Sequence, residues 1–479
     1  MAKTSIAADV SKLTLSKSIT YGITLITSMI LSRILSLAEY GTYSQIQVTG
    51  TLFLTVFSMG MPECSSFFLS RDTDPGYRLR FLSTYYTLNT FLGLLAGAAA
   101  AALAPAIADY FRNPAVTGLA YVLAAFPWMN IIINSVDNIL VVYHKTSRLM
   151  VFRISSSVLL LAVILAAWLF HLSFHQYMAL FVAADSLCAL AVYAIVRRLS
   201  GGLQIRIDRS LIGSIVRFSV PLGLAGIVGT VSIQLDKLII SNYFSTEQLA
   251  VFTNAAQEMP ITIISAAMTA VLMPRIVRLL DRRRYGDAVR LWGHTIRLVY
   301  LLFCFFVSLF FVFAPQIIVL LYSEKYAGGT AVFRVYCLVS LLRTTYFGMI
   351  LNCIGRTRFI FYSSVASLAL NVGLSFLCYR LWGFVGPAVA TLICIVVINL
   401  IQLVFTCKCI SIPFRRIFPW RSLLRITLLN VALAAAVSFL QRIHAAGAPL
   451  LAALWAAVYG LLAFRPIGKQ WRILNEPEN

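Results

Sequence analysis

Charged residues are scarce in this chain. They make up 12% of its 479 residues, whereas roughly a quarter of the residues are charged in a typical soluble domain. Hydrophobic residues make up 60% instead, and apolar stretches of about twenty residues, long enough to span a bilayer as a helix, recur along the whole chain. The composition therefore excludes a set of soluble domains and predicts one integral membrane unit.

Acidic residues are scarcer than basic ones. The chain has 17 Asp and Glu against 39 Lys and Arg, which gives a net charge of +22. On a soluble protein this excess would suggest nucleic-acid binding. Here the basic residues lie mostly in short loops between apolar stretches, where Lys and Arg set the orientation of membrane helices and contact anionic lipids. We therefore expect the lipid bilayer, and no nucleic acid, as a partner.

Familiar catalytic and nucleotide-binding motifs are missing. The sequence contains no G-x-G-x-x-G, no P-loop and no H-E-x-x-H, so neither nucleotide-driven transport by this chain nor a known type of metallohydrolase has support. The nine cysteines include no C-x-x-C pair and are predicted to be small core residues. We expect no cofactor, no metal site and no enzymatic activity.

The hydropathy pattern predicts an all-α polytopic membrane protein with about 14 transmembrane helices. Lys and Arg concentrate in every second loop, most densely at 275–297, where a basic amphipathic helix is expected. This asymmetry predicts that both termini are cytoplasmic. The predicted spans are 15–35, 43–67, 81–108, 115–142, 149–170, 177–196, 220–243, 250–272, 298–321, 330–353, 359–378, 384–405, 423–440 and 448–464.

A weak internal repeat divides the chain. Residues 39–44 follow the first span and resemble residues 248–253, which follow the seventh. Because transporters are often built from duplicated bundles, the repeat predicts two parallel six-helix lobes. The expected domains are an N-terminal lobe at 1–197, a basic cytoplasmic linker at 198–217, a C-terminal lobe at 218–405, and two additional helices with a cytoplasmic tail at 406–479.

Glycines at short spacings indicate where helices approach closely. Gly93 and Gly97 lie in the third predicted span, and Gly223, Gly226 and Gly229 lie in the seventh. Small residues at such spacings let helix backbones come together. We therefore predict close helix contacts at all five positions.

Polar side chains inside the predicted spans are candidates for function, because a charge at the bilayer centre costs at least a few kcal/mol. Coupling to H⁺ or Na⁺, or gating, would use carboxylates, whereas a stripe of asparagines at i, i+4 and i+8 would suit a hydroxyl-rich cargo such as sugar. Structural pairing between helices is the alternative for each residue. The carboxylates are Asp137, Asp185, Asp236 and Glu258, and the asparagines are Asn130, Asn134 and Asn138.

Short motifs resemble the polysaccharide flippases, often called Wzx-type, of the multidrug, oligosaccharidyl-lipid and polysaccharide exporter superfamily. The resemblance rests on the order and span position of four segments: Ser32-Arg33-Ile34-Leu35 followed by Glu39-Tyr40-Gly41-Thr42-Tyr43; Phe218-Ser219-Val220-Pro221-Leu222; Leu235-Asp236-Lys237-Leu238-Ile239-Ile240; and Trp382-Gly383-Phe384-Val385-Gly386-Pro387-Ala388.

The resemblance implies a bacterial inner-membrane flippase with two lobes around a central cavity that opens alternately to the cytoplasm and the periplasm. The implied cargo is an oligosaccharide repeat unit on polyprenyl pyrophosphate, used for O-antigen, capsule or exopolysaccharide. A polysaccharide polymerase and a chain-length regulator are the implied protein partners. Cations in the cavity would bind the pyrophosphate, and the candidates are Arg33, Lys237, Arg334 and Arg343. A cation-coupled multidrug exporter and a peptidoglycan lipid II flippase remain as alternatives.

Overall fold

The structure, a computed structural model, describes residues 6–72, 74–257, 262–345, 347–443 and 447–475. These residues form helices and no strand, which confirms the predicted all-α class. The helices pack into two compact units, Met1–Thr253 and Asn254–Asn479.

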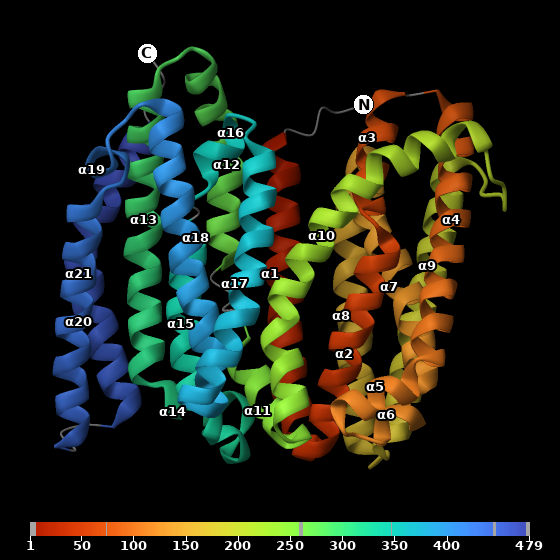
Figure 1. The fold of residues 1–479 in the computed structure, drawn as a ribbon, viewed down its shortest axis with the longest axis horizontal. Helices are drawn as coiled ribbons and strands as arrows, with labels where there is room; N and C mark the ends of the chain where they lie inside the picture. Colours follow the sequence, from red (N-terminus) through yellow and green to blue (C-terminus); the bar gives the residue numbers. More distant parts are fainter. Residues whose placement is uncertain (1–5, 73, 258–261, 346, 444–446, 476–479) are drawn as a thin grey trace. The chain divides into compact units, whose positions relative to one another are not determined.

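The first unit holds ten helices, and an eleventh crosses the division between the units (Figure 1). Their bounds are α1 Ile6–Ile34, α2 Leu37–Ser58, α3 Met61–Arg71, α4 Pro75–Ala102, α5 Ala104–Phe111, α6 Ala115–Gly118, α7 Ala120–Val142, α8 Thr146–Leu169, α9 Phe174–Ser200, α10 Arg209–Tyr243 and α11 Thr246–Ala255.

The second unit continues with long helices joined by short helical turns. Their bounds are α12 Thr262–Asp281, α13 Tyr285–Val312, α14 Ala314–Tyr322, η1 Glu324–Gly329, α15 Thr330–Thr344, α16 Met349–Cys353, α17 Thr357–Trp382, η2 Gly383–Val385, α18 Gly386–Ile410, α19 Phe414–Ile417, α20 Trp420–Arg442 and α21 Ala448–Asn475.

The number of membrane crossings depends on how broken helices are counted. Within the described residues, nine helical segments are long and apolar enough to cross a membrane, or ten if the bent pair α4 and α5 forms one span. One of the nine, Arg358–Ile410, contains α18 and most of α17. A polytopic helical membrane protein is thus confirmed, while the count of 14 spans stays a prediction.

Several predicted spans are broken in the structure. The span expected at 43–67 divides because Met59 and Gly60 adopt left-handed backbone conformations, with φ of 41° and 72°. Proline then follows at the start of α3, where its missing N–H leaves no partner unsatisfied. The span expected at 81–108 bends by 56° between α4 and α5, and those expected at 298–321 and 330–353 are interrupted after Val312 and Thr344.

The expected basic amphipathic helix at 275–297 is also two helices. The helix α12 ends at Asp281 and α13 begins at Tyr285, because Arg283 turns the chain with a φ of 57°. Arg284 then pairs with Asp287 at 2.8 Å. The prediction of one continuous helix was therefore wrong, and the arginines divide between the ends of two helices.

The internal repeat corresponds to two matching helix starts. In α2, the Ser36 side chain accepts from the Glu39 N–H and Glu39 accepts from the Ser36 N–H, which is a capping box. Ser245 and Gln248 make the same reciprocal bonds at 3.2 Å before α11. The similarity that the sequence shows at 39–44 and 248–253 is therefore explained, at its first position, by how these helices begin.

The expected linker at 198–217 is held along α4. The backbone N–H groups of Gln204, Arg206 and Asp208 donate to hydroxyls of Ser83, Thr87 and Thr84, at 3.1–3.3 Å. Asp208 then caps α10, and hydrogen bonds from Ser210 lower the pKa of its carboxyl. By its packing, α10 belongs to the first unit, whereas the sequence analysis placed it in the C-terminal lobe. The predicted lobe boundaries stay a prediction.

The helices α4 and α7 approach at two glycines. A Cβ on Gly97 would lie 1.9 Å from the Ala124 carbonyl oxygen, and one on Gly93 would lie 2.8 Å from Trp128 Cα. A Cβ on Gly223 would likewise lie 2.5 Å from the backbone carbonyl carbon of Met59. These close contacts are confirmed. The prediction was wrong for Gly226 and Gly229, where nothing among the described residues lies within 4 Å.

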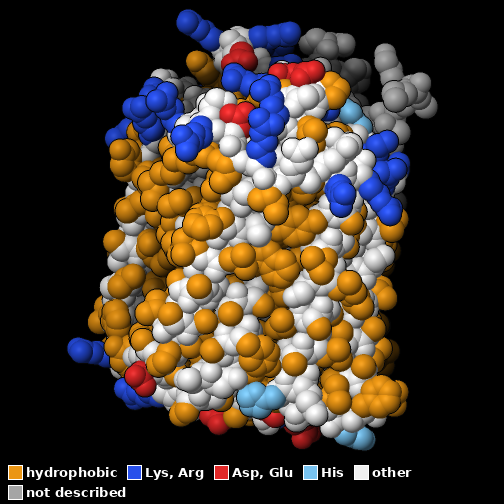
Figure 2. All heavy atoms as spheres, turned by 90° about the vertical axis from the view of Figure 1, so that its right-hand side faces the viewer, with side chains coloured by type: hydrophobic (Ala, Val, Ile, Leu, Met, Phe, Trp, Pro, Cys, Tyr) orange, Lys and Arg blue, Asp and Glu red, His pale blue; other side chains and the backbone are white. Residues whose placement is uncertain are grey.

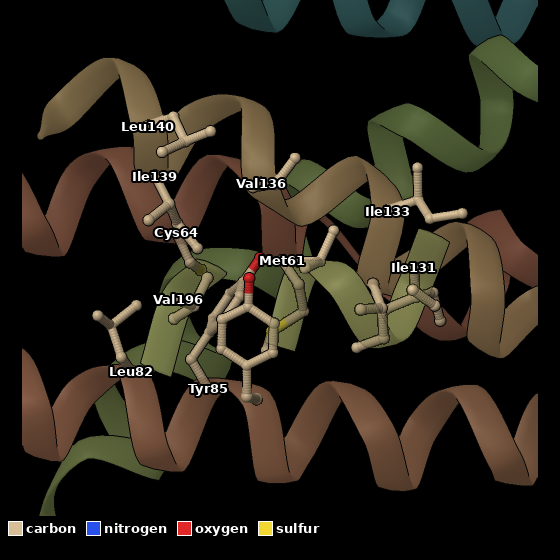
Figure 3. Packing of buried hydrophobic residues seen from close by; sticks show 14 of the residues in the cluster. Met61, Cys64, Leu82, Tyr85, Ile131, Ile133, Val136, Ile139, Leu140 and Val196 are labelled. Carbon is tan, nitrogen blue, oxygen red and sulfur yellow. The ribbon is translucent and has the colours of Figure 1, made fainter. Parts of the chain in front are cut away.

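Buried side chains, most of them from α3, α4, α7 and α9, form the core of the first unit. Tyr85, Leu82 and Cys64 have no exposed surface, and they pack with Val136 and Val196 (Figure 3). On the outside of this unit a broad hydrophobic band covers the helices, and most Lys and Arg side chains in view gather at one end of them (Figure 2). This surface suits a bilayer with a charged interface.

Candidate functional site

The second unit contains an apolar groove lined by residues of α13, α15 and α20, of which α13 packs against both of the others (Figure 1). Its volume is about 690 Å³. Val307, Leu338, Leu341 and Val431 line its walls. Ser308, Thr427 and Ser438 also line the groove, and the first two hydroxyls donate to backbone carbonyls of their own helices. A groove with such mostly apolar walls can hold a hydrocarbon chain.

Polar side chains gather at the end of this groove where α13 and α20 stop. Arg334 comes from the second turn of α15, and Gln441 and Arg442 end α20. No Asp or Glu is among the described residues that line the groove. The groove therefore combines an apolar length with a positively charged end.

Arg334 is fixed in place by the end of α13. Its Nε donates to the Phe311 carbonyl oxygen at 3.0 Å, and its guanidinium lies 5.5 Å from the Phe311 ring centroid. This carbonyl is one of the last four of α13, which lack a partner inside the helix. One of five N–H donors is used in this way, so the guanidinium is oriented and keeps donors for an anion in the groove.

The first unit contains a separate polar cluster between α7 and α8. Arg153 pairs with Asp137 at 2.8 Å, and its Nη2 lies 3.4 Å from Asn134 Oδ1. The Arg153 side chain is 24% exposed and that of Asp137 is 43% exposed. Asn134 and Asp137 are thus brought together by an arginine of α8 that was not among the candidates from the sequence.

The other two asparagines of the predicted stripe bond elsewhere. Asn130 Nδ2 donates to the Phe126 carbonyl of its own helix at 3.0 Å. Asn138 Nδ2 donates to the Pro62 carbonyl at 2.7 Å, at the start of α3. Asn138 therefore supports the break between α2 and α3, and its role as a sugar ligand stays a prediction.

The remaining candidate cations are spread over the chain. Arg33 is exposed at the end of α1, and its Nη1 donates to the Met29 carbonyl at 2.8 Å. Lys237 lies half-buried on α10. Arg343 is half-buried on α15 but does not line the groove that holds Arg334, as expected for residues nine positions apart on one helix.

The candidate carboxylates lie in different surroundings. Asp185 is 7% exposed on α9, near the phenols of Tyr43 and Tyr177. Asp236 is 2% exposed on α10. Glu258 lies outside the described residues. Coupling to H⁺ or Na⁺ at these positions stays a prediction, as does a role for Asp137.

Two functional candidates were missed from the sequence. Asp137 lies eight residues before Lys145, and Arg153 lies eight residues after it. A short helical hairpin that turns at Lys145 therefore places Asp137 and Arg153 at the same height on neighbouring helices. This symmetry was a usable signal. Arg442 offered no such signal, because only the packing of α20 against α13 brings it to the groove.

Long apolar helices with charged ends, broken by turns inside the apolar region, define a polytopic helical membrane fold. The structure resembles "Lipid II flippase MurJ, inward closed conformation" with a TM-score of 0.72 at 12% identity, covering 96% of this chain and 99% of that one. It also resembles an inward-facing multidrug resistance MATE family transporter of the MOP superfamily (TM-score 0.65, 16% identity, 82% and 94% covered). A MATE transporter of Vibrio cholerae matches with a TM-score of 0.60 at 15% identity, covering 85% and 97%.

At these identities the likeness shows the fold alone. No curated protein matches the chain. The family model described as "Polysaccharide biosynthesis protein" matches residues 30–330, which is more than half of the chain. The chain therefore belongs to this polysaccharide biosynthesis family, and it shares the fold of the three transport proteins named above.

Proposed function

We propose that this protein moves polyprenyl-pyrophosphate-linked oligosaccharide repeat units from the cytoplasmic to the periplasmic leaflet of the bacterial inner membrane, by alternating access. Its termini would be cytoplasmic. Membership of the polysaccharide biosynthesis family supports this cargo. A polysaccharide polymerase and a chain-length regulator would act on the delivered units.

The observation that carries the proposal is the groove of the second unit. Its apolar walls match a polyprenyl chain, and Arg334 at its charged end matches a pyrophosphate, which accepts several charge-assisted hydrogen bonds. Under the predicted orientation, α13 and α20 end on the periplasmic side, so this end of the groove would receive the headgroup after translocation. The sugars would be bound by polar side chains such as Asn134.

Deleting the gene in its host tests the proposed cargo. We expect loss of surface polysaccharide together with accumulation of lipid-linked repeat units on the cytoplasmic face, both reversed by the wild-type gene. Unchanged surface polysaccharide with increased sensitivity to cationic drugs would instead indicate that the protein is a multidrug exporter. Accumulated lipid II with arrested cell-wall synthesis would replace it with a lipid II flippase.

The charged end of the groove is tested by replacing Arg334 with Gln in the complementing gene. A charge-assisted hydrogen bond contributes about 1.5–3 kcal/mol, so we expect delivery of repeat units to fall about tenfold or more. Arg380→Gln is the matched control, because Arg380 is exposed at the end of α17 and outside the groove. Pulse-labelling of surface polysaccharide at equal protein levels measures the rate. Equal rates for the two variants would show that Arg334 does not bind the cargo.

A further inference from the structure

A second cavity of the second unit lies where α13 begins, against the connection between α18 and α20. Its volume is about 830 Å³. Five arginines line it together with apolar side chains that include Phe418 and Trp420. The arginines are Arg290, Arg297, Arg415, Arg416 and Arg421.

No acidic side chain balances these arginines within the described part of the cavity wall. Asp287, one turn before Arg290, is already bonded to Arg284 at 2.8 Å. The Nε of Arg297 is buried and has no hydrogen-bond partner among the described residues. Because burying a charged donor without a partner is costly, the cavity is suited to a bound anion.

Aromatic packing holds the cavity in shape. The Phe418 ring stacks on Phe347 at 4.8 Å and meets the edge of Trp292 at 5.4 Å. Trp420 Nε1 donates to the Phe414 carbonyl at 3.0 Å. The segment that carries Arg415 and Arg416 is therefore anchored on both sides, so little ordering would be needed when a ligand binds.

The cavity lies at the level where apolar helices become charged. No charged residue occurs at 298–312 of α13, directly after Arg297, or at 426–440 of α20, a turn after Arg421. Basic pockets at this level bind lipid headgroups in other membrane proteins. A ligand here would place its anion among the arginines and its acyl chains against the apolar helix surfaces.

We propose that this cavity binds the phosphate headgroup of an anionic phospholipid, such as phosphatidylglycerol, which stabilises the second unit. The proposal is independent of the transported cargo, because this cavity and the groove that holds Arg334 share no lining residue.

The test is thermal unfolding of the purified full-length protein in a neutral detergent, with dioctanoyl phosphatidylglycerol or dioctanoyl phosphatidylcholine added. Only a ligand that binds the folded state raises the unfolding temperature, so we expect a rise with phosphatidylglycerol alone. Arg416→Gln/Arg421→Gln should weaken the apparent affinity about tenfold or more. These two side chains are exposed, so their replacement leaves the core intact.

Arg278→Gln/Arg282→Gln is the matched control, because both side chains are exposed near the end of α12 and outside the cavity. It should leave the affinity for phosphatidylglycerol unchanged. Equal stabilisation by phosphatidylcholine, or an equal loss in both double variants, would overturn the proposal. Inorganic pyrophosphate is the third probe, and stronger stabilisation by it than by phosphatidylglycerol would assign the cavity to a pyrophosphate compound instead.

Discussion

Replacing Gly97 with alanine is expected to destabilise the first unit by about 3 kcal/mol, the upper part of the usual cost of overpacking. The added Cβ would lie 1.9 Å from the Ala124 carbonyl oxygen. Because the obstacle is backbone, no side-chain rotation relieves it, and α4 and α7 must separate. Their buried contacts would weaken along their whole length. Thermal unfolding of the purified protein in detergent should shift down by several degrees.

The same substitution at Gly226 provides the control. Gly226 is exposed on α10 with nothing among the described residues within 4 Å. Alanine favours a helix over glycine by up to about 1 kcal/mol, so Gly226→Ala should be neutral or stabilising. Gly97→Ala would also gain this helix preference. An unchanged or raised unfolding temperature for Gly97→Ala would therefore show that α4 and α7 do not touch there.

The second large effect is expected at the ion pair between α7 and α8. Arg153→Gln leaves Asp137 without its cation, and we expect a loss of stability of about 1–2 kcal/mol. This is below the cost of a charge at the centre of a membrane helix, because the Asp137 side chain is 43% exposed. The measurement is again thermal unfolding, with surface polysaccharide as a functional readout. Arg148→Gln, an exposed change in the first turn of α8, should have little effect.

A double variant separates pairing from ion coupling at Asp137. Asp137→Asn/Arg153→Gln removes both charges and keeps a polar side chain at each position, so it should recover most of the stability lost in Arg153→Gln. If the pair is only structural, surface polysaccharide recovers with it. Recovered stability without recovered polysaccharide would give Asp137 a role in transport. A double variant as unstable as Arg153→Gln would refute the pairing itself.

The class of the fold follows from composition, because few charges and recurrent long apolar stretches leave helices in a bilayer as the only solution. The helix breaks do not follow from it. At 59–60 the break depends on Met59 entering a left-handed conformation that its side chain does not favour. The neighbouring Pro62 and Gly60 were available signals, but proline is also common in membrane helices.

The candidate site was predictable only where partners are close in the chain. Asp137 and Arg153 lie at equal distances from one hairpin, whereas the groove joins residues of α13, α15 and α20 that are up to about 140 positions apart. The five arginines of the second cavity also come from two distant segments, 290–297 and 415–421. The packing of Phe418 against Trp292 brings these two segments together.

The close contact between α4 and α7 has a mechanical consequence. If α4 slid along α7 by one helical turn, Asn89 or Ala101 would take the place of a glycine, and either would bring a Cβ into the α7 backbone. The two helices are therefore fixed in register and move together as one rigid pair. The flexing of the proposed transport cycle would then occur at other joints, such as the left-handed turn at Met59 and Gly60 between α2 and α3.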